Sequence, residues 1–408
     1  MGRSVIVGEI QQGRPGALDG VVILDLTHHI AGPFCTKLLA DFGAQVIKIE
    51  RPGLGDIARH LAPFAGNSPN REKSLLFLYL NNNKMGTTLD LKSESGRQIF
   101  KALLGHASVV VENFSPGTME RLGLGYADLA GEKPDIIMAS LSNFGQTGPY
   151  RDFKTTNLVT SALSTAADAN RGRPKEPLQI SPSLTLYATG IAAAVAIVAA
   201  VRWRAKTGVG QYADISSLET AINLMRYPVT NLSFEDLGIK VPVEAYNRIM
   251  KAKDNYVGVN TLTQDQWELL CHMMEMPQIL EDPRFITGLD RQAHSDELLE
   301  ILGPVVARYP RDEYFHKAQE WRIPVSPVYS PEEMLQSPQY RARQFFVDVE
   351  HPEIVGGKQP GAPFKMSDSP WALRTLAPHL GEHNLAVYSG VLGYSTGEVT
   401  QLSELGVV

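Results

Sequence analysis

The chain has 408 residues, of which 43% are hydrophobic and 20% charged, and it carries a formal net charge of -6. This composition excludes disordered and fibrous proteins, and the length exceeds what one compact core usually serves, so we expect two domains. The negative charge argues against nucleic acid or an anionic membrane as a partner. The two cysteines, Cys35 and Cys271, lack a CxxC spacing, which excludes a disulfide scaffold and a thiolate metal site.

The first part of the chain alternates between apolar, β-branched runs and helical patterns. Gly20–Leu26 predicts a buried strand, and Pro33–Phe42 predicts a helix that ends at Gly43. Further strands are predicted at Ala44–Glu50, Ser108–Glu112 and Asp135–Leu141, with a helix at Ser95–Gly105. Continuous apolar strands separated by helices are typical of a parallel sheet covered on both faces, so the predicted fold class is α/β.

A long helix is predicted from Ser181 to about Ala205, and it contains the longest apolar stretch, Leu186–Val201. This stretch is short for a membrane span, and its small residues suit a helix packed inside a protein. The residues before Gly16 lack the apolar segment of a secretory signal. We therefore expect a cytoplasmic protein with no membrane partner.

The composition changes after a predicted strand at Tyr212–Ile215 and a helix from Ser216 to about Leu232. Residues 227–325 combine short strands with charged helices and are predicted to form a smaller α+β domain. The region 326–408 is rich in proline and glycine. The predicted division is therefore 1–226, 227–325 and 326–408.

Basic residues follow or precede several of the predicted strands. Arg51 comes directly after a strand, Lys84 lies in the run NNNK, and Arg121 lies in a turn after a short helical segment. Ligands of parallel sheets bind at the carboxyl ends of strands, and arginine suits phosphate oxygens. Each residue taken alone is more often a solvated surface charge. The residues by themselves indicate an anion-binding α/β protein and no particular reaction.

No metal site is predicted. His379 and His383 have the i, i+4 spacing of a zinc-binding helix, but Gly381 lies between them and Pro378 precedes them. The run is typical of the entry to a helix.

Several blocks, in order, resemble the family III coenzyme A (CoA) transferases, the group that contains formyl-CoA and carnitine-CoA transferases. The blocks are Ala31–Asp56, Leu78–Gly96, Val109–Tyr126, Pro134–Tyr150, Thr207–Ala221, Glu281–Phe285, Gly361–Pro370 and Leu380–Asn384. The resemblance covers nearly the whole chain. It implies a Rossmann-like large domain built from both chain ends, a smaller α+β domain, and an interlocked dimer.

The resemblance also implies which residues hold CoA or acyl-CoA, the substrate that the family shares. By their positions in the matching blocks, these residues are Arg51, Asn83, Lys84 and Arg121. They would bind the nucleotide and its phosphates.

The sequence departs from the family at the residue that performs the reaction. Family transferases use an aspartate, four residues before a glycine at the start of a long apolar helix, which attacks the acyl-CoA carbonyl and then carries CoA as a thioester. Here the position four before Gly190 is Leu186. The racemase branch uses a His–Asp region that reads Lys154-Thr155-Thr156 here. Neither chemistry is therefore expected of this chain, and no catalytic residue is predicted.

Three interpretations remain open from the sequence. The chain is a non-catalytic subunit whose partner is a catalytic family III paralogue that carries the aspartate. The expected substrates of such a complex are an acyl-CoA such as succinyl-CoA and a carboxylic acid such as benzylsuccinate, as in anaerobic aromatic degradation. Alternatively, the chain forms a homodimeric CoA-binding or regulatory protein, or it is an active transferase that uses another acid, such as Asp214 or Glu219.

Overall fold

The computed structural model describes residues 16–169, 176–179, 181, 183–225, 230, 232–233 and 246–408. Contacts divide the chain into a larger unit, Met1–Pro228 with Phe345–Val408, and a smaller unit, Val229–Gln344. The expected boundary between residues 226 and 227 lies outside the described residues. The return to the larger unit comes at Phe345 and not at residue 326. Glu333 is paired with Arg311 at 2.9 Å, which keeps the segment around it with the smaller unit.

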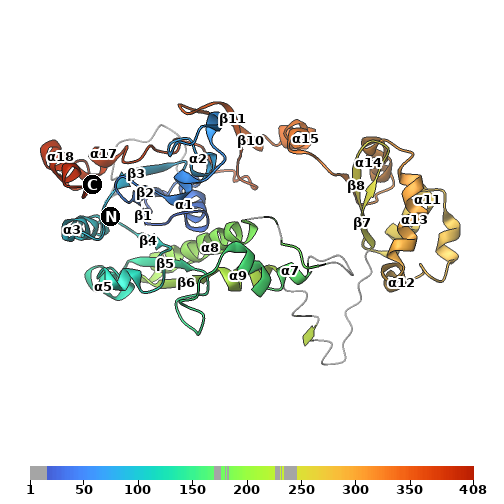
Figure 1. Cartoon of the computed structure of the whole chain (residues 1–408), viewed down its shortest axis with the longest axis horizontal. Coiled ribbons are helices and arrows are strands. Elements are labelled where there is room, and N and C mark those ends of the chain that lie inside the picture. The colour runs from blue at the N-terminus through green and yellow to red at the C-terminus, as the bar shows by residue number, and fades with distance from the viewer. Residues whose placement is uncertain are drawn as a thin grey trace. The chain divides into compact units, whose positions relative to one another are not determined.

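The larger unit is built on a parallel six-stranded sheet in the order β3-β2-β1-β4-β5-β6 (Figure 1). The strands are β1 (Val22–Asp25), β2 (Gln45–Glu50), β3 (Lys84–Thr88), β4 (Val109–Glu112), β5 (Ile137–Ser142) and β6 (Tyr212–Ser216). The predicted α/β class is confirmed. The strand order reverses between β1 and β4, and in open parallel sheets such a reversal leaves a crevice where ligands bind.

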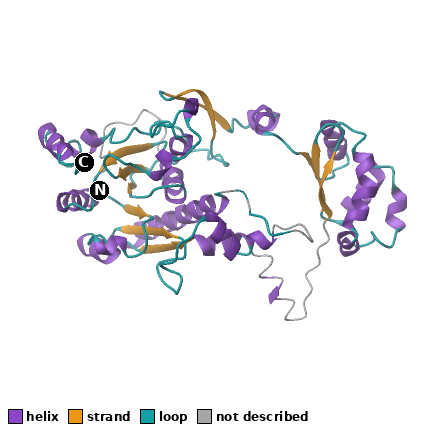
Figure 2. Ribbon diagram, in the orientation of Figure 1, coloured by secondary structure: helices purple, strands orange, loops and turns teal. Residues whose placement is uncertain are grey.

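Helices cover both faces of this sheet (Figure 2), and alternating strand residues belong to two separate cores. Ile23 and Val111 face a core shared with α1 (Ala31–Asp41) and α8 (Leu184–Thr207). Leu24 and Val110 face the opposite core. That layer contains α3 (Glu94–Leu104), α5 (Tyr126–Glu132), α17 (Asn384–Tyr388) and α18 (Thr396–Glu404). The sheet is thus buried on both faces, as the continuous apolar strands predict.

The helix α8 begins at the sheet's ligand-binding edge and packs closely on α1. A Cβ at Gly190 would lie 2.7 Å from the Ala31 carbonyl oxygen, so the two backbones approach at a distance that only glycine permits. Among the described helices, α8 is long and apolar enough to cross a membrane, with 33% of its apolar window buried. We expected a buried core helix, but one face, which includes Ile191 and Val195, is exposed.

The remaining elements of the larger unit are short. They are α2 (Leu75–Leu80), α4 (Thr118–Arg121), α6 (Asn157–Leu163), α7 (Ala166–Ala169), α9 (Ser217–Leu224), the 3-10 helices Ile57–His60 and Ala65–Asn67, and the antiparallel pair β10 (Phe346–His351) and β11 (Ile354–Pro360). The C-terminal segment closes on the sheet, since the Asp90 amide donates to the Val407 carbonyl at 2.8 Å.

The smaller unit has its own core. Its antiparallel sheet has the order β7-β8-β9, formed by Tyr246–Lys251, Tyr256–Thr261 and Val325–Pro327. The helices are α11 (Gln264–Met273), α12 (Gly288–Ala293), α13 (Ser295–Val306), α14 (Arg311–Glu320), α15 (Pro331–Gln336), α16 (Pro338–Ala342) and the 3-10 helix Pro277–Glu281. Trp267, Leu298 and Val257 are buried in its centre.

Candidate functional site

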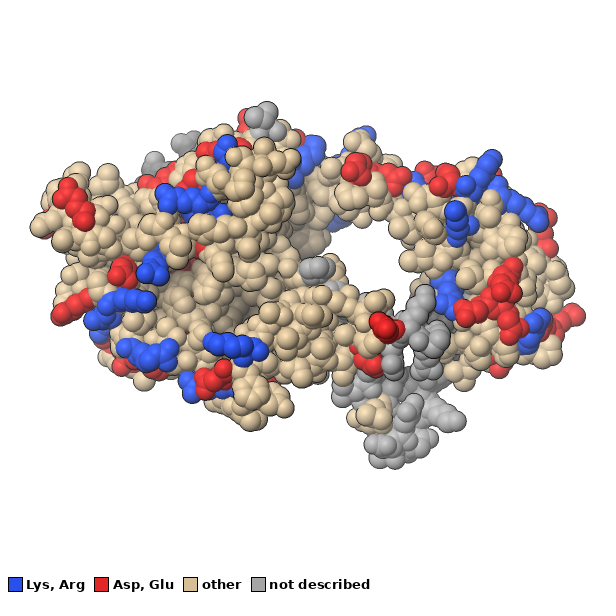
Figure 3. Space-filling model, in the orientation of Figure 1, with Lys and Arg blue, Asp and Glu red and all other residues tan. Residues whose placement is uncertain are grey.

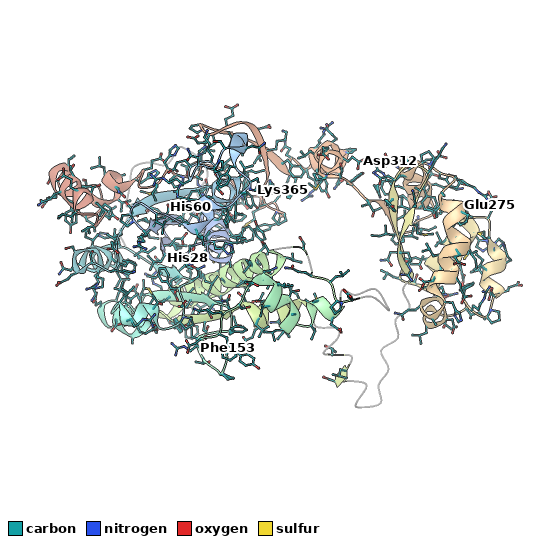
Figure 4. The ribbon with its side chains drawn as sticks, in the orientation of Figure 1. His28, His60, Phe153, Glu275, Asp312 and Lys365 are labelled. Atoms are coloured by element: carbon teal, nitrogen blue, oxygen red, sulfur yellow. The ribbon has the colours of Figure 1, made fainter. Side chains whose placement is uncertain are left out.

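Two adjoining cavities open at the carboxyl ends of the parallel strands. The first has a volume of about 660 Å³ and the second about 720 Å³. They share His28, Phe114 and Thr118 as lining residues, so one extended ligand can occupy both. His60 of the first cavity, His28 of both and Phe153 of the second follow one another along this side of the larger unit (Figure 4).

The first cavity is mainly apolar, with cationic side chains at its edge. Its apolar lining consists of Leu26, Ile49, Leu54, Ile57, Leu89, Leu91, Phe114 and Leu122. Arg51, His60 and Lys92 also line it and are exposed to solvent. Apolar walls with a few guanidinium or ammonium groups suit a ligand that combines an aromatic ring with phosphate groups.

Buried ion pairs fix the loop that forms one wall of this cavity. Lys48 Nζ lies 2.8 Å from Asp56 Oδ2, and Arg59 Nε lies 2.8 Å from Glu50 Oε2, with all four side chains almost fully buried. Arg59 also contacts the Phe77 ring, 3.6 Å from its centroid. Burial alone would raise the pKa of Asp56, but the Lys48 charge and hydrogen bonds outweigh it and lower that pKa. The wall is therefore held as a charged, rigid structure.

The turn after β1 is tied to both neighbouring strands. The backbone amide of His28 donates to Asn113 Oδ1 at 2.9 Å, and Asn113 Nδ2 donates back to the His28 carbonyl at 2.8 Å. The His29 amide donates to Asp56 Oδ1 at 2.8 Å. Burial lowers the pKa of both histidines, so both are predominantly neutral at pH 7. Neutral imidazoles thus line the second cavity, and that of His28 also lines the first.

The structure brings two of the predicted CoA ligands to these cavities. Arg51 lines the first cavity directly after β2, and Arg121 lines the second at the end of α4. Arg121 Nη2 donates to Thr118 Oγ1 at 2.8 Å, and both side chains belong to the same short helix. Arg51 thus lies beside a cavity, as expected from the rule that ligands bind at the carboxyl ends of parallel strands.

Lys84 is placed elsewhere, because it starts β3 and does not end it. Its ammonium group is fully buried and contacts Asp25 Oδ2 at 3.1 Å, the Pro33 carbonyl at 2.9 Å, Thr36 Oγ1 at 2.8 Å and Asn81 Oδ1 at 3.0 Å. Burial alone would raise the pKa of Asp25, but two neighbouring lysine charges lower it to about 2. Lys84 lines neither cavity, and its contacts are those of a structural ion pair.

Asn83 also lines neither cavity and instead anchors the C-terminal segment. Its Nδ2 donates to Asp41 Oδ1 at 2.7 Å and to the Ala372 carbonyl at 2.9 Å. Its Oδ1 accepts from the amides of Arg374 and Thr375. With these partners the side-chain amide is already saturated.

Lys92 is a cavity residue that the sequence reasoning missed. It lies just beyond the carboxyl end of β3, is exposed, and lines the first cavity with Arg51. Its position in the sequence could have indicated this. The strand β3 starts at Lys84, so Lys92, which follows the strand, lies at its carboxyl end, where ligands bind.

The second cavity contains Leu186, the residue that the resemblance places at the family's nucleophile position. Leu186 lines it from the first turn of α8, and Ser142 and Ser217 line it from β5 and α9. A leucine side chain offers neither a nucleophile nor a proton. Asp214 and Glu219, the alternative acids, are exposed and do not line this cavity. Asp152 does line it, from the loop after β5.

A buried carboxyl group lies behind the junction of the cavities. Glu112 ends β4 and is 4% exposed, and the residues that follow it, Asn113 and Phe114, line the cavities. Burial raises the pKa of Glu112 to about 7, although hydrogen bonds from Ser140 and from the Phe114 amide oppose the shift. This group is therefore partly protonated near neutral pH.

Lysine and arginine side chains lie around a hollowed face of the larger unit (Figure 3). The cavities on this unit contain Arg51, Lys92, Arg121, Arg151 and Lys154. These basic side chains are thus gathered locally on a chain whose net charge is -6.

Comparisons with known proteins agree with this architecture. The sequence matches the family model of CoA-transferase family III over residues 18–384. An acyl-CoA transferase of Fusarium pseudograminearum is 35% identical, covering 96% of this chain and 88% of the relative. A succinyl-CoA–D-citramalate CoA-transferase of Chloroflexus aurantiacus is 33% identical, covering 97% and 99%.

A solved structure of a CAIB/BAIF family protein from Brucella suis superimposes with a TM-score of 0.80. It is 26% identical, and the match covers 93% of this chain and 100% of that chain. Sequence and fold thus agree over nearly the whole length, and the chain belongs to CoA-transferase family III.

Proposed function

We propose that this chain is an aspartate-lacking subunit of a heteromeric CoA-transferase, which binds CoA but leaves the covalent chemistry to a paralogous partner. The single observation that carries the proposal is Leu186 in the second cavity. The resemblance assigns the nucleophile to this position.

The chemistry explains why the substitution matters. A carboxylate attacks the acyl-CoA carbonyl, the C–S bond breaks, and CoA thiolate leaves as a mixed anhydride forms. The thiolate then attacks the carbonyl of the enzyme's own carboxyl group and releases the acyl group as a free acid. The incoming acid later reverses these steps, so the carboxylate serves both as nucleophile and as leaving group. Leu186 can take no part in any of these steps.

The CoA-binding features are retained although the nucleophile is absent. Arg51 is the proposed phosphate ligand in the first cavity, and Lys92 joins it because it lines the same cavity, whereas Arg121 binds the ligand from the second cavity. Asn83 and Lys84 stabilise the amino end of β3, since their polar atoms are hydrogen-bonded to other residues of the protein. We assign these two a structural role in the CoA site.

The proposed partner is a family III paralogue that carries the aspartate. Support comes from the exposed face of α8, where Ile191, Val195 and Val198 are 51%, 65% and 44% exposed. Side chains of this kind along one helix are typical of a protein–protein interface. An interlocked arrangement of two subunits would cover them.

For the substrates we propose succinyl-CoA as the donor and a carboxylic acid such as benzylsuccinate as the acceptor. Succinyl-CoA is named for the Chloroflexus relative, which supports the donor. The acceptor follows from the resemblance to the two-subunit benzylsuccinate CoA-transferase of anaerobic toluene breakdown.

The runner-up is an active transferase that uses another acid. Asp152 favours it, since this carboxylate lines the cavity that contains Leu186. Its side chain is 76% exposed and lies 3.9 Å from Arg151, so it lacks the burial of a tuned nucleophile. A homodimeric CoA-binding protein without activity is the third reading, and it differs from the first only in its partner.

Expression of the chain alone and with an aspartate-bearing paralogue tests the proposal. We expect a stable mixed complex with transferase activity, and no activity from the chain alone. Substitution of the paralogue's aspartate by asparagine should abolish the activity of the complex. Activity of the lone chain that disappears in Asp152→Asn would instead establish the runner-up.

A further inference from the structure

We propose that the second cavity selects CoA thioesters whose acyl group ends in a free carboxylate, and that Arg151 is the residue that selects them. This inference rests on the proposed binding of acyl-CoA by this chain. It assigns a binding role to Arg151 and Lys154, to which the proposed function gives none.

Two guanidinium groups converge on one point of this cavity. A Cβ at Gly117 would lie 2.9 Å from Arg151 Nη2 and 3.1 Å from Arg121 Nη1. Gly117 has a φ of +77°, so the left-handed backbone and the missing side chain together leave room for both groups. Two like charges held this close repel one another unless an anion lies with them.

No protein carboxylate fills that role among the described residues. Arg151 makes an ion pair with Asp152, a 3.9 Å contact from its Nε, and among the described residues no ion pair is found for Arg121 or Lys154. Lys154 is exposed and lines the cavity three residues after Arg151. Three cations, Arg121, Arg151 and Lys154, thus share the cavity with one carboxylate, Asp152. Leu186 in place of an aspartate removes a second negative charge.

Two buried polar atoms of the lining lack hydrogen-bond partners in the described structure. They are Ser142 Oγ and Arg151 Nε, and both residues line the second cavity. Buried polar groups are almost always hydrogen-bonded, so such atoms point to a polar ligand group. A carboxylate accepts several hydrogen bonds, which matches a guanidinium, an ammonium and a hydroxyl as donors.

The position of Leu186 indicates which end of the ligand lies here. The thioester carbonyl must approach the nucleophile position, so the acyl group extends into the second cavity. The first cavity supplies its own cations, Arg51 and Lys92, for the phosphates. The alternative anion is the diphosphate of CoA, which every CoA ester contains. A terminal carboxylate, in contrast, is present in some esters and absent from others.

Calorimetric titration of the full chain with succinyl-CoA, butyryl-CoA and CoA tests the assignment. Succinyl and butyryl groups have four carbons each and differ in the terminal carboxylate. We expect succinyl-CoA to bind at least about tenfold more tightly than butyryl-CoA, as a charge-assisted hydrogen bond provides. Arg151→Ala should remove most of that preference, Lys154→Ala should remove less, and neither should change CoA affinity more than about twofold.

Arg341→Ala is the matched control, because it removes the same charge from an exposed site in the smaller unit. It should leave all three affinities unchanged. Equal binding of succinyl-CoA and butyryl-CoA would overturn the inference, as would no binding of any CoA ester. If Arg151→Ala weakens all three ligands equally, the anion is the diphosphate and the inference is wrong. None of these outcomes depends on turnover, so the proposed division of labour between subunits is tested separately.

Discussion

The two cavities are built in different ways. The wall of the first is fixed by buried ion pairs, such as Lys48–Asp56 and Arg59–Glu50, whose side chains are at most 1% exposed. The second is lined by three cations, Arg121, Arg151 and Lys154, with one lining carboxylate, Asp152, and by Leu186, which the resemblance places at the nucleophile position. One half of the site has fixed, paired charges, whereas the other has a leucine where the resemblance expects the reacting carboxylate.

This contrast separates binding from catalysis along the length of one ligand. Under the proposed function, the fixed charges hold the nucleotide while another subunit performs the reaction. The covalent step requires one particular oxygen, and replacing that residue removes the step without disturbing the scaffold. The predictions below test each half of the contrast.

The largest effect is expected for Lys84→Met. It leaves Asp25 buried without its lysine partner, and breaking a buried pair costs about 3–5 kcal/mol of stability. Lys92→Met removes the same charge from an exposed position of the first cavity and should change stability by less than about 0.5 kcal/mol. Urea unfolding followed by circular dichroism measures both.

The same pair of variants also separates structure from binding. CoA affinity should fall in Lys92→Met and stay unchanged in the folded fraction of Lys84→Met. A Lys84→Met protein that is fully stable but does not bind CoA would show that Lys84 is a ligand after all.

A pH effect of intermediate size is expected from Glu112. Burial raises its pKa to about 7 in the folded protein from an ordinary value of 4.5. The folded state therefore holds its proton between pH 4.5 and 7 while the unfolded state releases it, so this group's contribution to stability falls by about 3 kcal/mol as pH rises through that window.

Glu112→Gln removes this titration. Relative to the unsubstituted chain, the variant should gain stability between pH 5 and pH 8, measured as the shift in urea midpoint. A difference between the two proteins that is the same at both pH values would contradict the assigned pKa.

The smallest of these effects is expected for Arg51→Ala. An exposed guanidinium beside a phosphate contributes about a tenfold change in affinity, so CoA should bind about tenfold more weakly with unchanged stability. Arg341→Ala again serves as the control. Unaltered CoA binding by Arg51→Ala would show that CoA does not bind in the first cavity as proposed.

The sheet was predictable from the sequence because its strands are continuous apolar runs, such as Gly20–Leu26 and Ala44–Glu50. Arg51 was predictable for the same reason, since it follows one of these runs. The motif did not indicate that Asn83 and Lys84 lie away from the cavities, because their hydrogen-bond partners lie far along the chain. Asp25 is 59 residues from Lys84, and Arg374 is 291 residues from Asn83.

The second cavity was less accessible to sequence reasoning. The departure at Leu186 could be read from its spacing to Gly190, because position along a helix is set by the local chain. The convergence of Arg121 and Arg151 over Gly117 could not, because it depends on how two loops fold toward each other. Long-range contacts of this kind carry no signature in a single sequence.

The most direct test of the central claim is to locate the CoA adduct in the working complex. The complex of this chain with its aspartate-bearing paralogue would be mixed with succinyl-CoA, quenched, and each subunit examined by intact-mass and peptide mass spectrometry. We expect a covalent CoA thioester on the paralogue's aspartate and none on this chain. A CoA adduct on Asp152, or on any other residue of this chain, would contradict it.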